Sequence, residues 1–482
     1  MKKMNLLVMS LVSAAALSFT SCSSNDDLDG NAGQAKVDQF YMTLTIQTPN
    51  SNGTRTAVKD YPTENATPAE SDVTSGTFYL VDANNKIVFT HTITKEEWAE
   101  KKIPTQGTPG KTTLQVPVKD VTAGTKYSVY FLANTTTSNS PLTDVFTSDN
   151  KFATAYSTAN NFAMFNQNDA DVKGNSHTVV FTSDNKDASS AAKVSSPINI
   201  ERLTARIDEP KSAVNTIQPY AEDATASKEQ KEANANAIKA VKSLKLTSYA
   251  ISNVANKTNV MQQWADETTL SIPTGINYFQ PTKEFGTKTL LQNYGYFNAV
   301  TTARSQKDYV FENNSSEAAT SMYFEYTVEL SDDYKTNADF EDGTFYRYNK
   351  VIYSRIQDII DAYKDQKAIF DGKDAATVKA ELKAAKDDTT DRETKLDEFR
   401  KKYDIEVFNA GKTYYVQKIQ DQHLGVANTI QRNSIYLLNV KNIFNVGAQV
   451  PNGGPDDRTL YYLDVEVSVN PWVLNEQSVE FE

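Results

Sequence analysis

Residues 40–47 read FYMTLTIQ, and apolar side chains alternate with polar ones along the stretch. Successive side chains of a β-strand point to opposite sides, so this alternation predicts a half-buried strand. Its apolar face carries Phe40, Met42, Leu44 and Ile46. The next residues, 49–55, read PNSNGTR, and their turn-forming side chains predict an exposed loop that ends at Arg55.

The same pattern returns near the C-terminus, where residues 463–470 read LDVEVSVN. Its apolar positions are Leu463, Val465, Val467 and Val469. Pro471 and Trp472 follow and interrupt strand pairing, because proline lacks an amide hydrogen. The spacing of the four apolar residues repeats that of residues 40–46, so the two strands could occupy one groove.

The chain between these strands has the composition of a mainly β protein, with 25 Tyr, 22 Phe and abundant Thr, Val and Asn. We expect further strands at 76–81, 86–90, 113–118, 126–133, 179–181, 198–207, 243–251, 309–312, 322–330, 412–419 and 434–443. Residues 82–85 predict a hairpin turn. Capping-box spacing predicts helix starts at Thr94 and at Ser227.

Helical periodicity appears in one later region, 350–404. The apolar stripe runs through Ile352, Ile356, Ile359, Ile360, Tyr363, Val378, Leu382, Ala385, Leu396, Phe399 and Tyr403. A capping box is expected from Thr390 to Glu393. The pattern predicts an inserted helical lobe, which is either a contact surface or a decorated loop packed on its own sheet.

Cys22 is the only cysteine in the 482 residues. It follows Lys2, Lys3, an apolar run over 6–19 and two small residues, as in a secretory signal peptide. The segment resembles a bacterial lipoprotein signal, which implies acylation of Cys22, although Phe19 stands where leucine is usual. The alternative is an ordinary signal peptide. Residues 23–27, SSNDD, resemble the signal that exports Bacteroidales lipoproteins to the cell surface.

Composition and motifs argue against several functions. A formal net charge of −12 disfavours binding to nucleic acid, which needs clustered basic residues. The sequence has no GxSxG, GxxxxGK[ST], GxGxxG or HExxH motif and no EF-hand pattern, so we expect no catalysis, cofactor or metal site. The three tryptophans, Trp98, Trp264 and Trp472, could stack on sugars, but core or interface positions are commoner.

Five short stretches resemble one known family. They are 122–134 (TAGTKYSVYFLAN), 201–206 (ERLTAR), 309–313 (YVFEN), 432–436 (RNSIY) and 465–472 (VEVSVNPW). Their order and spacing are similar to those of fimbrillins, the shaft subunits of Bacteroidales type V pili. The helical lobe has no counterpart in the family pattern.

The resemblance implies two transthyretin-like β-sandwich domains with a helical insertion in the second. It also implies cleavage after Arg55, so that Thr56 begins the mature chain and strand 40–46 is displaced by a donor strand of the next subunit. The implied divisions are a signal peptide (1–21), a tether and removable strand (22–55), an N-terminal domain (56–206), and a C-terminal domain (207–482) with the insert (350–404) and donor strand (459–482).

The implied function is that of a structural pilus subunit that supports adhesion. Expected partners are like subunits in a homopolymer, anchor and tip subunits, a processing protease and a surface receptor, with the outer membrane engaged through lipid before cleavage. Location would be the outer-membrane surface and then the filament. The alternatives are a surface glycan-binding lipoprotein, which needs no excisable strand, and a tip adhesin of the same pilus.

Overall fold

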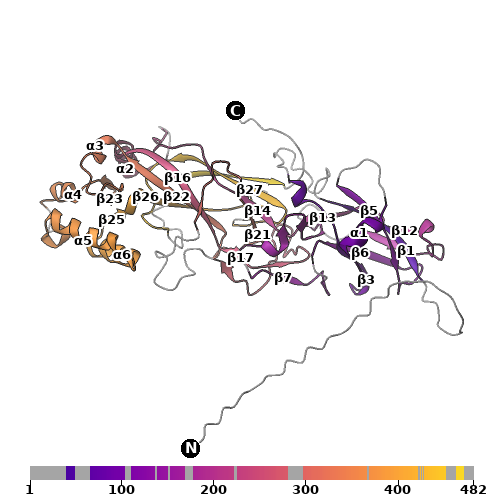
Figure 1. Cartoon of the computed structure of the whole chain (residues 1–482). Coiled ribbons are helices and arrows are strands. Elements are labelled where there is room, and N and C mark those ends of the chain that lie inside the picture. Colours follow the sequence, from indigo (N-terminus) through magenta and orange to yellow (C-terminus); the bar gives the residue numbers. More distant parts are fainter. Residues whose placement is uncertain are drawn as a thin grey trace, which may run out of the picture. The chain divides into compact units, whose positions relative to one another are not determined.

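Strands dominate the computed structural model (Figure 1), which confirms the prediction of a mainly β protein. The structure describes residues 39–48, 66–103, 110–135, 138–149, 152–168, 177–221, 225–279, 297–365, 369–421, 424, 426, 428–451 and, for the backbone alone, 463–471. No helix among these residues has both the length and the hydropathy to cross a membrane.

The N-terminal half of the chain builds a ten-stranded sheet. Its strands are β1 (Phe40–Gln47), β2 (Gly76–Val81), β3 (Ile87–Ile93), β4 (Lys102–Ile103), β5 (Lys111–Val118), β6 (Lys126–Ala133), β10 (Met164–Asn166), β11 (Thr178–Val180), β12 (Ala192–Lys193) and β13 (Ile198–Arg202). They run in the order β3-β2-β6-β10-β13-β1-β5-β4, with β11 beside β6 and β12 beside β1.

Local signals in this half form as predicted. The Asp82 carboxylate accepts hydrogen bonds from the amides of Asn84 and Lys86 and closes the β2–β3 hairpin. Helix α1 (Lys95–Lys101) begins after Thr94, which exchanges capping-box hydrogen bonds with Glu97.

The strand predicted at 198–207 is wrong as a single element. It is two strands, β13 and β14 (Ala205–Asp208), which belong to different sheets. Leu203 and Thr204 separate them, because the Leu203 amide donates to the Ala163 carbonyl and the Thr204 carbonyl accepts from the Asn433 amide. These two residues therefore leave the ladder, and the chain passes from one hydrophobic core to the next.

Beyond that break, two sheets face each other. The five-stranded sheet contains β14, β15 (Lys211–Ser212), β21 (Lys307–Val310), β27 (Ser434–Ile443) and β28 (Leu463–Pro471). The four-stranded sheet contains β16 (Val241–Ser252), β20 (Asn298–Ala299), β22 (Ser321–Leu330) and β26 (Lys412–Lys418). Helix α2 (Lys228–Ala240) leads into β16, and Ser227 forms the predicted capping box.

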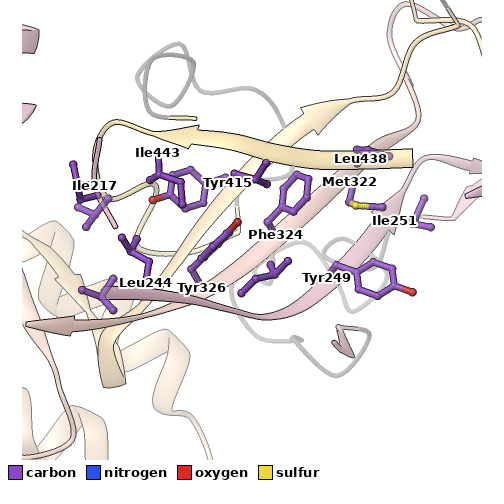
Figure 2. Packing of buried hydrophobic residues seen from close by; sticks show 14 of the residues in the cluster. Ile217, Leu244, Tyr249, Ile251, Met322, Phe324, Tyr326, Tyr415, Leu438 and Ile443 are labelled. Carbon is purple, nitrogen blue, oxygen red and sulfur yellow. The ribbon is translucent and has the colours of Figure 1, made fainter. Parts of the chain in front are cut away.

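One hydrophobic core joins these two sheets. Figure 2 shows Met322, Phe324 and Tyr326 of β22 beside Leu438 and Ile443 of β27. All five side chains are buried, which is expected when the inner faces of two sheets interdigitate.

The predicted helical lobe is present. It contains α4 (Ile356–Ala362), α5 (Ala375–Asp387) and α6 (Arg392–Tyr403), which share a separate core with a sheet of β23 (Phe345–Tyr348), β24 (Val351–Tyr353) and β25 (Glu406–Phe408). The lobe is thus packed on its own small sheet.

Two details of the lobe prediction are wrong. Ile352 lies in β24 and not in a helix. The capping box at Thr390 does not form, because α6 begins after Asp391, and the amides of Thr390 and Asp391 donate to the Asp388 carboxylate. A local turn at Asp388 therefore precedes the helix.

The remaining elements are short. They are η1 (Pro68–Glu70), β7 (Val145–Thr147), η2 (Thr154–Tyr156), β8 (Ser157–Thr158), β9 (Asn161–Phe162), η3 (Ala188–Ser190), β17 (Val254–Ala255), β18 (Lys257–Asn259), β19 (Tyr278–Phe279), α3 (Asp332–Lys335), η5 (Ile369–Gly372) and η6 (Asn409–Gly411). Among them, β7 pairs with β18 and links the two halves of the chain.

Candidate functional site

Strand β1 is an internal strand of the ten-stranded sheet. It pairs antiparallel with β5 along its full length of eight residues, from Phe40 opposite Val118 to Gln47 opposite Lys111. Its other edge pairs in parallel with β12 and β13. Removing β1 would therefore separate β5 and β4 from the rest of the sheet.

The apolar face of β1 is buried as its sequence predicts. Phe40, Met42, Leu44 and Ile46 are each at most 3% exposed and belong to the core of this sheet. On the opposite face, the hydroxyls of Thr45 and Thr113 form a hydrogen bond of 2.9 Å. Burying four such side chains contributes about 1.5–3 kcal/mol each, before the cost of ordering the strand.

Backbone hydrogen bonds show which way the residues of β1 face. The Tyr41 amide donates to the Asn185 carbonyl, and the Thr43 carbonyl accepts from the Val194 amide, both away from β5. The alternate residues of β1 therefore bond to β5. Without β1, backbone groups on both sides would lose their partners and form two open sheet edges.

A buried carboxylate fastens the chain where it resumes after the 49–65 segment. Glu70, in η1, accepts hydrogen bonds from the Thr67 amide at 2.7 Å and the Tyr309 hydroxyl at 2.7 Å. It also forms ion pairs with Arg206 at 3.3 Å and Lys307 at 3.2 Å. Arg206 lies on β14 and Lys307 and Tyr309 on β21, so Glu70 joins η1 to the five-stranded sheet.

Arg202 completes this group, which we call the Glu70 cluster (Glu70, Arg202, Arg206, Lys307 and Tyr309). The fully buried Arg202 guanidinium donates to the Glu70 carbonyl at 2.7 Å, to Ser71 at 2.8 Å and to Asn433 at 2.9 Å. It therefore holds both η1 and the start of β27.

Opposing effects set the charge of Glu70. Burial alone would raise the pKa of its carboxyl group, but Arg206, the Thr67 amide, Tyr309 and Lys307 outweigh burial and lower the pKa to about 2. Burial, together with the hydrogen bond to Glu70, raises the pKa of Tyr309. The cluster is thus a charged, closed contact at neutral pH.

A second buried ion pair lies nearby in sequence terms. Arg432, before β27, pairs with Glu312 at 2.8 Å and donates to the Val260 carbonyl at 2.9 Å and the Thr258 hydroxyl at 3.0 Å. Thr258 lies on β18, which pairs with β7. Arg432 therefore holds β27 to the strand pair that links the two halves.

Sequence analysis missed both clusters as sites. Their residues were nonetheless inside the stretches that carry the family resemblance, because Arg202 and Arg206 belong to ERLTAR, Glu312 to YVFEN and Arg432 to RNSIY. Glu70 gave no such signal. These stretches hold the junction between sheets, and no catalytic constellation accompanies them in the residues quoted.

Strand β28 contains the four predicted donor positions, Leu463, Val465, Val467 and Val469. It pairs antiparallel with β27 of the same chain, from Leu463 opposite Ile443 to Pro471 opposite Ser434. The other side of β27 pairs with β14 and β15, so β28 is an edge strand. β1 and β28 belong to different sheets, and the intrachain pairing matches the resting place that an uncleaved chain requires.

Three other predicted site residues, Cys22, Arg55 and Thr56, lie outside the described residues. Trp98 packs in the first core, 6.1 Å from Phe131, and the Trp264 indole donates to the Asn168 carbonyl. Trp472 also lies outside the described part. The described residues contain no cluster of His, Cys, Asp and Glu that could hold a metal ion.

Comparison with solved structures finds similar but distant folds. Two crystal structures of candidate cell adhesion proteins from Parabacteroides distasonis have TM-scores of 0.46 and 0.45 at 11% and 12% identity. Each comparison covers 91% of this chain, and 98% and 100% of the other. A fimbrial assembly protein from the same organism has a TM-score of 0.31 at 11% identity, covering 60% of this chain and 82% of that one.

Comparison with curated proteins finds no match. A family model does match residues 406–478, and it describes the C-terminal region of fimbrillin, the major fimbrial subunit protein type IV. The matched region contains β25, β26, β27 and β28. Residues 406–478 therefore belong to the fimbrillin family, which confirms the resemblance read from the sequence.

Proposed function

We propose that this protein is a shaft subunit of a surface pilus that polymerises by strand exchange after cleavage at Arg55. The fimbrillin match over residues 406–478 supports the role of a pilus subunit at the cell surface, which assembles with like subunits and is structural rather than catalytic. Lipid attachment at Cys22, the two transthyretin-like domains divided near residue 206, and the anchor and tip partners belong to the same proposal.

The observation that carries the proposal is the internal position of β1. Cleavage after Arg55 would cut the chain between β1 and the Glu70 cluster, so that β1 could leave while η1 stays fastened. Its departure would leave an apolar groove between two open edges. A strand from another molecule can fill such a groove by β-augmentation.

β28 is suited to be that strand. It has nine residues against eight in β1, and as an edge strand it can leave after breaking one ladder of hydrogen bonds. Residues 451–455, PNGGP, precede it and favour a turn-rich connection. Groove and donor lie on different sheets, so the contact is heterologous and propagates into a filament.

The side chains explain why cleavage is needed. The apolar face of β1 offers Phe, Met, Leu and Ile, whereas that of β28 offers Leu and three Val. The smaller residues fill the groove less completely, and underfilling costs stability. β1 is also tethered beside its groove, which raises its effective concentration. An intact β1 would therefore exclude the donor.

The rivals have less support. A surface glycan-binding lipoprotein has no need for an excisable strand. A tip adhesin would use an added recognition surface, and the helical lobe is the candidate for one, but the lobe closes its own core against β23 to β25.

Assembly of purified protein tests the proposal. After treatment with an arginine-specific protease, the wild-type chain should begin at Thr56 and form filaments visible by electron microscopy. Arg55→Ala should stay monomeric, whereas Arg392→Ala, at an exposed arginine of α6, should assemble. Val467→Asp should be cleaved yet fail to assemble, because a charge in a dry groove costs several kcal/mol.

Two results would overturn the proposal. One is filaments whose subunits begin upstream of Asp38, since β1 would then still occupy its groove. The other is assembly by a chain truncated at Arg458, which lacks β28.

A further inference from the structure

We infer that the donor strand enters in the direction of β1 and in one register, with Leu463, Val465, Val467 and Val469 at the positions of Phe40, Met42, Leu44 and Ile46. Thr113 and Lys193 are the residues that recognise its outer face. The inference rests on the proposed strand exchange and names the geometry of the partner, a second copy of this chain.

The neighbours of β1 favour this direction. β5 pairs with β1 antiparallel at eight positions, whereas β12 and β13 pair in parallel at two positions each. A donor in the same direction keeps the long antiparallel ladder with β5. A reversed donor would run parallel to β5, and parallel pairing is slightly less stable per residue.

The apolar pockets restrict the register. A slip by one residue would turn every apolar side chain of the donor to the outer face. A slip by two would leave one of the four pockets of β1 empty and place one apolar residue beyond the groove. Only the proposed register, or its exact reversal in direction, fills all four pockets.

The outer face then separates the two directions. In the proposed arrangement Ser468 replaces Thr45 and can restore the hydroxyl contact with Thr113, which is 2.9 Å long in the present chain. Reversal would bring Asp464 to that place and Ser468 opposite Pro117. In the proposed register Glu466 takes the place of Thr43, beside the exposed Lys193 of β12.

Engineered disulfides can read this geometry, because Cys22 is the only cysteine and lies upstream of the proposed cleavage. The outward residues of β1 direct their backbone groups away from β5, so they face β5 as non-hydrogen-bonded pairs, with Cα atoms about 4.5 Å apart. That separation permits a disulfide.

The decisive pair is Ser468→Cys with Thr113→Cys in one chain. Filaments assembled under reductant and then oxidised should give a ladder of covalent multimers on a non-reducing gel. The matched control, Ser468→Cys with Pro117→Cys, should stay monomeric on the gel. A second pair, Asn470→Cys with Lys111→Cys, should also form the ladder and covers the case in which one double variant does not assemble.

Each contrary outcome has a separate meaning. Filaments that cross-link through position 117 and not 113 would overturn the direction, and filaments that cross-link Ser468→Cys with Gln115→Cys would overturn the register. Both results would leave strand exchange standing. Failure of the cleaved wild-type chain to form filaments would instead overturn the proposed function and this inference with it.

Lys193 has its own test. Glu466→Lys should slow assembly about two- to fivefold at low salt, the range expected for an exposed ion pair, and Lys193→Glu in the same chain should restore the rate. Equal rates for the single and double variants would overturn the role of Lys193.

Discussion

The hydroxyl group of Tyr309 donates a hydrogen bond of 2.7 Å to the carboxylate of Glu70, which lies 239 residues earlier in the chain. Tyr309 belongs to β21 of the five-stranded sheet, and Glu70 lies in η1, just before the first sheet continues at β2. This contact and the ion pairs of Glu70 hold the segment that follows the proposed cleavage loop. They explain how β1 could be removed without releasing the rest of its sheet.

Glu70→Gln should destabilise the protein in a pH-dependent way. The folded pKa of about 2 lies below the ordinary 4.5, so the charge of Glu70 stabilises the fold fully above pH 4.5, by roughly 3 kcal/mol. That stabilisation is lost as the pH falls through about 2. Urea unfolding of wild type and variant should show a difference that shrinks over this window.

The matched control is Glu317→Gln, at an exposed glutamate, which should change stability little at any pH. A difference between wild type and Glu70→Gln that stays constant from pH 5 to pH 2 would contradict a charged Glu70.

Val467→Leu with Val469→Ile should strengthen the joint between subunits. In the inferred register these residues replace Leu44 and Ile46, so each substitution restores the side chain that β1 places there. Two added methylene groups contribute about 1–2 kcal/mol per joint. The urea concentration needed to dissolve filaments should rise. Ser468→Thr adds a methyl group on the outer face and should leave it nearly unchanged, and an equal rise for both would argue against the register.

Cys22→Ala should abolish lipid anchoring. The acyl chains of a lipoprotein are its hold on the membrane, and no other cysteine can carry them. Cell fractionation should show unprocessed precursor and loss of the protein from the outer membrane, whereas Ser23→Ala should be processed normally. Normal surface display of Cys22→Ala would refute the lipoprotein interpretation.

Leu382→Ala should destabilise the helical lobe by about 2–5 kcal/mol, because Leu382 is fully buried in the core of that lobe. Filament assembly should continue, since neither β1 nor β28 belongs to the lobe. Hydrogen exchange should increase over residues 356–403, while the exposed Lys383→Ala should leave exchange unchanged. Loss of assembly in Leu382→Ala would instead place the lobe in the subunit joint.

The sequence by itself determined the features that depend on neighbouring residues. The alternation of residues 40–47 predicted β1 and its buried face, because the period of two is a property of an extended backbone. The spacings of Thr94 with Glu97 and of Ser227 with Gln230 predicted two helix starts, because a capping box closes within one turn.

The tertiary structure decided what depends on residues distant in sequence. The apolar pattern of 198–207 runs on through Leu203 and Thr204, and the break appears only because Ala163 and Asn433 take their backbone hydrogen bonds. Thr390 has capping-box spacing, yet the Asp388 carboxylate takes its amide first. Glu70 reads as an ordinary glutamate until folding brings Arg206, Lys307 and Tyr309 around it, because burial and opposite charge act through space and leave no period in the sequence.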